Sequence, residues 1–241
     1  MDKYKKVIYD NYIKNHNENL YGKATTAKMD AVAKVLDFYY GRHLLEDKNI
    51  NILDIGCGNG NLVYWLNSLG YKNVKGIDVS QQQIDQGTSF GIKNLECIDL
   101  FTFLNQNTIK FDIIIAKDVI EHFTRDEVFD ILSLVYNNLN EKGRFMMQVP
   151  NGEGLFYTSI FYGDYTHEMA YTASSVNQVA LNTGFSKSKC FPVAPPPLGI
   201  KSRVRSLLWS LIVFKLKFSK MVATGSSSGI FTPNLIAVIG K

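Results

Sequence analysis

The chain of 241 residues is long enough for one large α/β domain with its own core. Hydrophobic residues make up 46% and charged residues 20% of it, a globular balance that excludes a disordered or fibrous chain. The three cysteines do not make a disulfide framework, so we expect a reducing, cytoplasmic compartment. The polar N-terminus predicts no secretory signal, and no apolar run approaches the roughly 20 residues of a membrane span.

The net charge of +4 is unevenly distributed along the chain. Residues 1–168 hold 17 basic and all 22 acidic residues, whereas residues 169–241 hold nine basic residues and no acid. This asymmetry indicates either an anionic partner for the C-terminal third or a solvated basic face. Because the charge is confined to one segment and no RNA-binding module is recognisable, we expect no nucleic-acid partner.

Helical spacing of apolar residues over Lys28–Tyr40 predicts a helix within an N-terminal cap, residues 1–48. Short apolar strands then alternate with helices. The predicted strands are Asn49–Ile55, Asn73–Asp78, Asn94–Ile98, Phe111–Ala116, Arg144–Val149, Phe185–Phe191 and Leu235–Ile239, and the predicted helices are Asn61–Leu69, Gln81–Gly87, Arg125–Leu139 and Ser174–Thr183.

This alternation predicts an α/β fold with a Rossmann-like, doubly wound, mostly parallel sheet of seven strands. The last two strands break the alternation. We therefore expect a single domain in which a core (49–192) is followed by a basic insertion (193–229) and a last strand (230–241).

A glycine-rich loop follows the first strand, with the pattern D-x-G-x-G-x-G over Asp54–Gly60. Glycines there permit a tight turn and close approach of a ligand to the backbone at the carboxyl edge of the sheet. The spacing differs from the dinucleotide pattern G-x-G-x-x-G, and the lysine of a phosphate-binding Walker loop is absent. Asp78 and Asp99 stand at the ends of the next two strands.

The loop resembles motif I of the class I S-adenosylmethionine (SAM)-dependent methyltransferases. The resemblance implies that SAM is the cofactor, that the last strand is antiparallel, that Asp78 binds the ribose and that Asp99 binds the adenine. The implied cofactor-binding residues are Asp54, Gly56, Cys57, Gly58, Asn59, Gly60, Asp78, Val79, Asp99, Leu100 and Lys117. Cys57 has no neighbouring metal-ligand partner in the sequence and is interpreted as a small residue beside the backbone.

The segment Asp118–Phe123 follows the fourth strand. It lacks the Asn/Asp-Pro-Pro-Tyr/Phe box of enzymes that methylate amide or adenine nitrogens. Its D-V-x-E-H string resembles O-methyltransferases acting on quinone precursors and sugars. His122 is one candidate base, and packing beneath the cofactor is the alternative. A Mg²⁺ site at Asp118, Glu121 and His122 is a further alternative, but Asp118 replaces the usual Glu, so we predict no metal.

A second string, Y-x-D-x-T-H-x-x-x-Y-T over Tyr162–Thr172, follows Pro150-Asn151. It resembles methyltransferases of bacterial surface-polysaccharide clusters. Its tyrosines offer stacking faces for a sugar, and Asn151, Asp164 and His167 offer hydrogen bonds to hydroxyls. We predict His167 as the catalytic base with Asp164 beside it. The alternative is a packed loop with a structural Asp–His pair.

Together these motifs predict a SAM-dependent O-methyltransferase that acts on a sugar hydroxyl of a nucleotide-linked or lipid-linked surface glycan. Two alternatives remain open: a quinone-precursor-like, small-molecule O-methyltransferase, and a catalytically inactive SAM-binding partner protein. Tyr12, His16 and Tyr21 are candidates to cap the cofactor.

The insertion has a basic, amphipathic middle, Leu198–Val222, without any acid. A helix of this kind can lie on an anionic membrane, here the inner face. Packing against the domain or in a homodimer is the alternative, and the alternation over Phe214–Phe218 also permits a strand.

Overall fold

The computed structural model describes residues 3–10 and 26–241. Its strands are β1 (Asn51–Ile55), β2 (Asn73–Asp78), β3 (Leu95–Cys97), β4 (Phe111–Lys117), β5 (Leu139–Pro150), β6 (Lys187–Pro192) and β7 (Asn234–Gly240). Its helices are α1 (Lys3–Asp10), α4 (Thr26–Tyr40), α5 (Asn61–Ser68), α6 (Gln81–Ser89), α7 (Leu100–Gln106), α8 (Arg125–Asn138), α9 (Tyr157–Phe161), α10 (Ala173–Asn182) and α11 (Ile200–Thr224), with short 3-10 turns η1 (Gly41–His43) and η2 (Ile120–His122).

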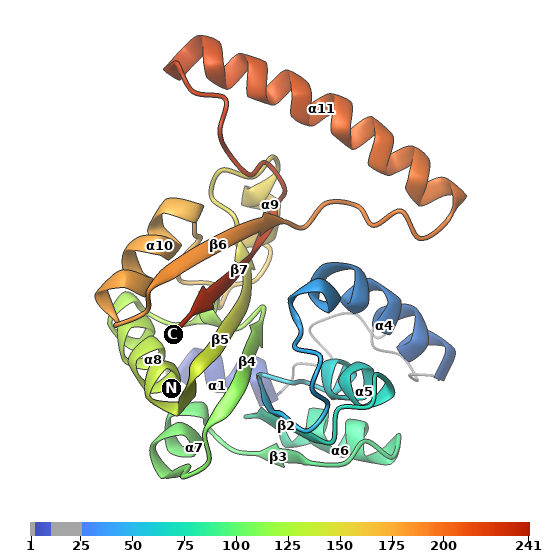
Figure 1. The fold of residues 1–241 in the computed structure, drawn as a ribbon, viewed down its shortest axis with the longest axis vertical. Helices are drawn as coiled ribbons and strands as arrows, with labels where there is room; N and C mark the ends of the chain where they lie inside the picture. The colour runs from blue at the N-terminus through green and yellow to red at the C-terminus, as the bar shows by residue number, and fades with distance from the viewer. Residues whose placement is uncertain (1–2, 11–25) are drawn as a thin grey trace.

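The strands form one seven-stranded sheet in the order β3-β2-β1-β4-β5-β7-β6. Strands β1 to β5 pair in parallel, and β7 runs antiparallel to both β5 and β6. This arrangement confirms the predicted doubly wound sheet with an antiparallel last strand (Figure 1).

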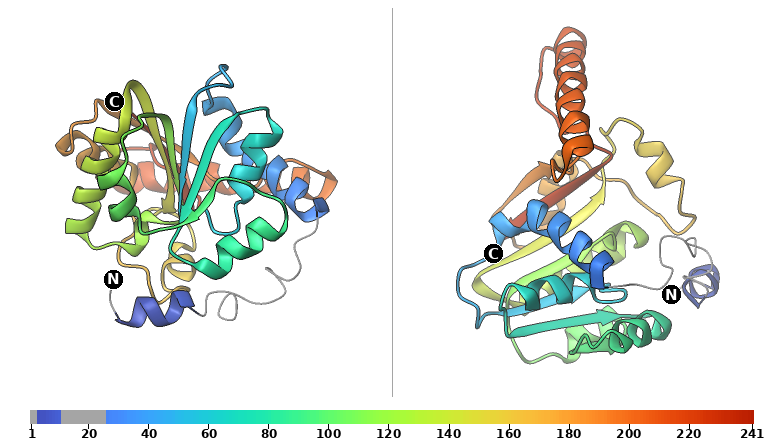
Figure 2. Two further views of the ribbon diagram at one scale, coloured as in Figure 1. Left: turned by 90° about the horizontal axis from the view of Figure 1, so that it is seen from below. Right: turned by 90° about the vertical axis from the view of Figure 1, so that its right-hand side faces the viewer.

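The core lies on both faces of the sheet because the central strands are apolar on both faces. In β4, Ile114 and Ala116 pack with α7, α8 and α10, whereas Ile113 and Ile115 pack with α4 and α5. The sheet therefore lies between two helical layers (Figure 2). This frame holds the carboxyl ends of the parallel strands at one edge.

Three differences from the predicted elements are local. β5 begins at Leu139, five residues before the predicted strand start at Arg144, and its register against β4 shifts between Phe111 and Ile113. The short helices α7 and α9 were not predicted. For α7 a signal existed, because the Asp99 side chain caps the helix by accepting a hydrogen bond from Thr102 N at 3.1 Å.

The insertion forms the long helix α11, which extends beyond the β6–β7 side of the sheet as an arm (Figures 1 and 2). It is continuous from Ile200 to Thr224, so the strand alternative for Phe214–Phe218 is wrong. Across the described parts of the chain, 3–10 and 26–241, every helix is too short or too polar to cross a bilayer.

Candidate active site

A cavity of about 540 Å³ opens at the carboxyl ends of the parallel strands. It is lined by the loop after β1, the ends of β2 and β4 and the start of α7, with Lys5 of α1 and Val32 of α4 closing it from the N-terminal side. Open α/β sheets bind ligands at this edge. All of the predicted cofactor-binding residues except Gly60 line the cavity.

The glycine loop takes a backbone path that other residues adopt only with strain. Gly56, Gly58 and Gly60 have φ angles of 67°, 52° and 81°. A Cβ atom on Gly56 would lie 2.3 Å from Val119 Cγ2, whereas one on Gly58 would meet no described atom nearer than Gln83 Oε1 at 3.8 Å. Because Gly58 lines the cavity, its missing side chain leaves room for a ligand against the backbone.

Asp78 connects the glycine loop to the end of β2. Its Oδ2 accepts a hydrogen bond from Gly58 N at 2.8 Å, and its Oδ1 accepts one from Ser80 N at 2.8 Å. Burial raises the pKa of this carboxyl, and the backbone hydrogen bonds partly offset the rise. Asp78 thus fixes the loop while presenting its remaining lone pairs to the cavity.

Asp54 supplies a test of whether the cavity fits SAM. It is buried at the cavity wall, and its Oδ2 has no hydrogen-bond partner among the described residues. Burial, together with the charge of Asp78, raises its pKa well above the ordinary value. A buried carboxylate oxygen that lacks a donor fits a ligand with a cationic, hydrogen-bonding group, and SAM carries an ammonium and a sulfonium.

The remaining cofactor-binding candidates have distinct environments. Lys117 forms an ion pair with Asp118 at the cavity wall. Burial raises the pKa of the Cys57 thiol far above its usual value, so the thiol stays protonated and unreactive. This agrees with the interpretation of Cys57 as a small packing residue. Tyr12, His16 and Tyr21 lie outside the described residues.

On the acceptor side, the two histidine motifs meet. The ring centroids of His122 and His167 lie 4.8 Å apart, although the two residues are 45 positions apart in the sequence. His122 lines the cavity, whereas His167 and Asp164 do not. His167 Nδ1 lies 3.0 Å from the backbone oxygen of Phe161, which can only accept, so Nδ1 carries the proton of the neutral ring.

Asp164, Thr166 and His122 form a hydrogen-bonded chain. The Thr166 hydroxyl donates to Asp164 Oδ1 at 2.6 Å, so it can only accept from His122 Nδ1 at 2.8 Å. In neutral His122, the other ring nitrogen, Nε2, is then the proton acceptor. Burial, with His167 nearby, lowers the pKa of His122 to about 4. Burial raises the pKa of Asp164, but the Thr166 hydrogen bonds together with the nearby His122 and His167 outweigh it, and the net pKa is lowered.

Lys5 and Thr166 were not predicted as site residues. Lys5 Nζ donates to the backbone oxygen of His122 at 2.7 Å and pairs with Glu168 at 3.0 Å, so α1 packs against the acceptor side. Thr166 stands within the D-x-T-H string, which was the available signal. Nothing in the sequence of α1 marked Lys5.

One group of donor atoms in the described residues is suited to a metal ion. Glu121, His122 and His167 each offer an atom, all within 4.8 Å of one another. Two imidazoles and a carboxylate suit a transition metal better than Mg²⁺, which prefers oxygen ligands. Asp118, part of the Mg²⁺ alternative, is not in this group and accepts from Gln148 Nε2 at 2.8 Å. The expectation that no metal is needed stays a prediction.

The loop whose sequence resembles that of sugar methyltransferases is only partly exposed to solvent. Tyr162 and Tyr165 are 78% and 83% exposed, whereas Asn151 and Tyr171 are fully buried. Asn151 Nδ2 donates to the backbone oxygens of Ile230 and Thr232, and its Oδ1 accepts from Glu153 N. The Asn151 side chain is therefore occupied by the backbone and is not available to a sugar.

We expect Asn151→Ala to lower the free energy of unfolding by about 2–4 kcal/mol, because it leaves buried backbone oxygens unsatisfied. Asn105→Ala is the control: Asn105 is exposed and makes one hydrogen bond within α7, to Phe101 O. Urea unfolding of both variants measures the difference. A stable Asn151→Ala variant with a raised acceptor KM would instead support a direct role in acceptor binding.

Residues 46–191, that is 146 of 241, match the family model of a methyltransferase domain. The chain belongs to this methyltransferase family. The match confirms the predicted SAM-dependent methyltransferase class, whose cofactor, SAM, suits the Asp54 and Gly58 environments described above.

Curated relatives of this methyltransferase domain are distant. It is 28% identical over 140 residues to the ubiquinone biosynthesis O-methyltransferase of Rickettsia akari, covering 55% of this chain and 52% of that protein. It is 32% identical over 126 residues to the mitochondrial ubiquinone biosynthesis O-methyltransferase of Saccharomyces cerevisiae (48% and 38%). A ribosomal protein L11 methyltransferase of Staphylococcus haemolyticus is 30% identical over 105 residues (42% and 32%). The matches span about half or less of these relatives' lengths.

Solved structures show the same fold at low identity. A SAM-dependent methyltransferase from Archaeoglobus fulgidus matches with a TM-score of 0.64 and 18% identity, covering all of both chains. Magnesium protoporphyrin IX methyltransferase from Synechocystis, with bound SAH, matches with a TM-score of 0.58 and 14% identity over 98% of this chain and 99% of that one. These matches establish the fold.

Proposed function

We propose that this methyltransferase domain transfers a methyl group from SAM to a hydroxyl of a small, phenol-like acceptor. The observation that carries the proposal is the Asp164–Thr166–His122 chain, which ends at the wall of the cofactor cavity. A hydroxyl becomes a strong nucleophile only as its proton leaves, and a positioned imidazole can take that proton.

Each residue of the chain has one task. Asp164 accepts a hydrogen bond from the Thr166 hydroxyl, Thr166 accepts one from His122 Nδ1, and this order leaves His122 Nε2 as the proton acceptor. SAM, when bound, supplies the methyl group from its sulfonium sulfur. The leaving group is then a neutral thioether. The residues of the glycine loop and Asp78 line the cavity and hold the cofactor there, so positioning of the two reactants carries much of the rate.

Two observations favour a phenol over an alcohol. The ubiquinone relatives are named as O-methyltransferases, and the matches to them extend over 140 and 126 residues. The buried His122 is a weak base. A phenolic hydroxyl has a pKa of about 10, whereas an alcohol is closer to water, at about 16, so a weak base is better matched to the phenol.

A sugar hydroxyl, of a nucleotide-linked or lipid-linked glycan, is the second candidate acceptor. One observation favours it: Tyr162 and Tyr165 are exposed on the loop that carries His167, where their rings can stack on a sugar. Against it, two further members of the proposed sugar site, Asn151 and Tyr171, are buried.

The test is an acceptor comparison with the purified full chain and SAM. We expect a catechol, such as dihydroxybenzoate, to be methylated at least about tenfold faster than a nucleotide sugar, because its hydroxyl is the stronger acid. Mass spectrometry measures S-adenosylhomocysteine and the methylated product. Turnover of nucleotide sugars alone would replace the proposal with the second candidate. Tight binding of S-adenosylhomocysteine without turnover of any acceptor would favour the inactive partner protein.

A further inference from the structure

The arm α11 carries an apolar stripe that points away from the domain. Residues Ile200, Val204, Leu207, Leu211, Phe214 and Phe218 are spaced alternately four and three positions apart, which places them on one side of a helix. Each of the six is more than half exposed. The stripe runs for about 27 Å at the usual helical rise of about 1.5 Å per residue.

The opposite side of α11 is the one that faces the rest of the protein. Six residues on this side are partly buried and therefore less exposed than the stripe. They are again four and three positions apart: Ser202, Ser206, Trp209, Val213, Leu216 and Lys220. Lys220 on this side pairs with Glu153 at 2.9 Å. No residue of α11 is buried, and the apolar stripe is the more exposed side of the helix, so it is open to an outside occupant.

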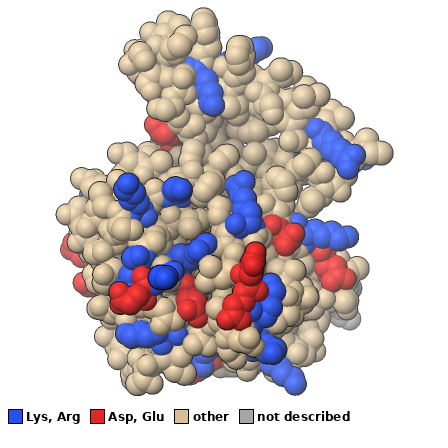
Figure 3. Space-filling model, viewed as in Figure 1, with Lys and Arg blue, Asp and Glu red and all other residues tan. Residues whose placement is uncertain are grey.

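The borders of the stripe are basic. At about 100° per residue, Arg203 and Lys217 lie along one border of the stripe and Lys201 and Lys215 along the other. No acidic residue occurs between 169 and 241. In Figure 3 the upper part of the molecule, which α11 forms, is mostly uncharged surface interrupted by basic side chains.

These features distinguish between two occupants. Soluble monomers rarely leave a contiguous apolar patch of this kind uncovered. A second copy would cover the stripe but would bring two sets of basic borders together with no acid on either helix. An anionic lipid surface instead offers an apolar layer for the stripe and negative headgroups for both borders.

We infer that α11 is an interfacial helix that docks the protein onto an anionic lipid bilayer, lying in the plane of the membrane with its apolar stripe in the headgroup region. The inference concerns α11 alone and does not depend on which acceptor is methylated.

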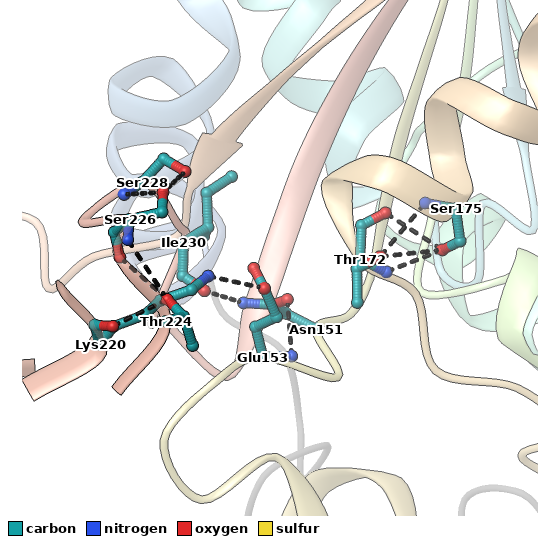
Figure 4. A network of polar contacts seen from close by, with 9 residues as sticks. All are labelled: Asn151, Glu153, Thr172, Ser175, Lys220, Thr224, Ser226, Ser228 and Ile230. Carbon is teal, nitrogen blue, oxygen red and sulfur yellow. Dashed lines mark hydrogen bonds and ion pairs between the residues drawn. The ribbon is translucent and has the colours of Figure 1, made fainter. Parts of the chain in front are cut away.

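The arm is also connected to the acceptor side. Lys220 pairs with Glu153, Glu153 N donates to Asn151 Oδ1, and Asn151 Nδ2 donates to the oxygen of Ile230, beyond the C-terminal end of α11 (Figure 4). Asn151 begins the loop that carries Thr166 and His167. Docking through α11 would thus hold that loop in a fixed relation to the membrane surface.

The first test is co-sedimentation of the full chain with vesicles of phosphatidylglycerol and phosphatidylcholine, against phosphatidylcholine alone. We expect binding to the anionic vesicles that falls as salt rises, because charges are screened within about 8 Å at physiological ionic strength. Leu211→Glu/Phe214→Glu should lower the partition constant by at least about tenfold, because it puts charge into the face that inserts into the headgroup region.

The matched apolar control is Phe129→Glu/Leu181→Glu. These two side chains are exposed on α8 and α10 of the body, so the pair adds the same charge and should leave vesicle binding unchanged. S-adenosylhomocysteine binding by each variant verifies that the domain remains folded.

The second test separates the basic borders from net charge. Arg203→Ser/Lys215→Ser/Lys217→Ser should lower binding to anionic vesicles on the order of tenfold or more. Lys72→Ser/Lys93→Ser/Lys142→Ser removes the same charge from exposed sites on the body and should not. Equal, negligible binding to both vesicle types at low salt would overturn the inference. So would sedimentation of a dimer that Phe214→Glu dissociates in the absence of vesicle binding, since the second copy would then be the occupant.

Discussion

Replacing Gly58 with valine is expected to lower the affinity for S-adenosylhomocysteine at least about 100-fold. Gly58 has a φ of 52°, which a β-branched side chain adopts only with strain. Its Cβ would enter open space at the cavity, where the cofactor approaches the backbone. The strain also acts on the Gly58 N–H, which donates to Asp78. Isothermal titration calorimetry measures the loss.

Gly70→Val is the matched control. Gly70 also has a positive φ, 88°, but no atom lies within 4 Å of the Cβ position, and it does not line the cavity. Both substitutions strain the backbone by about 1–3 kcal/mol. Only Gly58→Val should therefore affect the ligand, and unchanged affinity in that variant would place the cofactor elsewhere.

The central fold was predictable because its signals are local. The run Phe111–Ala116 is apolar at every position but one, which identifies a strand covered by helices on both faces, and β4 is such a strand. The start of β5 was missed because Asn140–Gly143 has turn-forming composition. In the structure Leu139 pairs with Phe111 of β4 ahead of this stretch, and the pairing with β4 resumes at Arg144 after a shift in register.

The candidate site was predictable in its parts but not in its assembly. The glycine loop and Asp78 were recognisable since they follow consecutive strands, whose ends the sheet necessarily brings together. The contact between His122 and His167 depends on how the loop after β5 folds back over η2. Lys5 reaches the site from α1, and no spacing in the sequence reports that long-range packing.

The arm α11 shows a further limit of sequence patterns. Its apolar spacing predicted an amphipathic helix, and α11 is helical throughout. The same spacing occurs in helices whose apolar side is buried, as α8 buries Val128, Ile131, Leu132 and Val135. Only the placement of the arm shows that the apolar stripe of α11 remains exposed.

Replacing His122 with alanine is expected to lower kcat by about 10²–10⁴-fold, the usual contribution of a general base. The sequence favoured His167 for this role, with a loss of about 10²-fold or more for His167→Ala. The structure provides a basis for choosing between them: His122 lines the cavity and has its tautomer set by Thr166, whereas His167 does not line it. Steady-state rates of both variants with the same acceptor decide the assignment.

Thr166 distinguishes a proton-transfer chain from simple packing. Thr166→Val keeps the shape but removes the hydroxyl between His122 and Asp164, so kcat should fall about tenfold or more, and Thr166→Ser should restore it because the hydroxyl returns. If His167→Ala is inactive while His122→Ala turns over normally, the base is His167. If both variants lose activity and a chelator abolishes that of the wild type, the two rings act together with Glu121 on a metal ion, because these are the three side chains whose donor atoms converge.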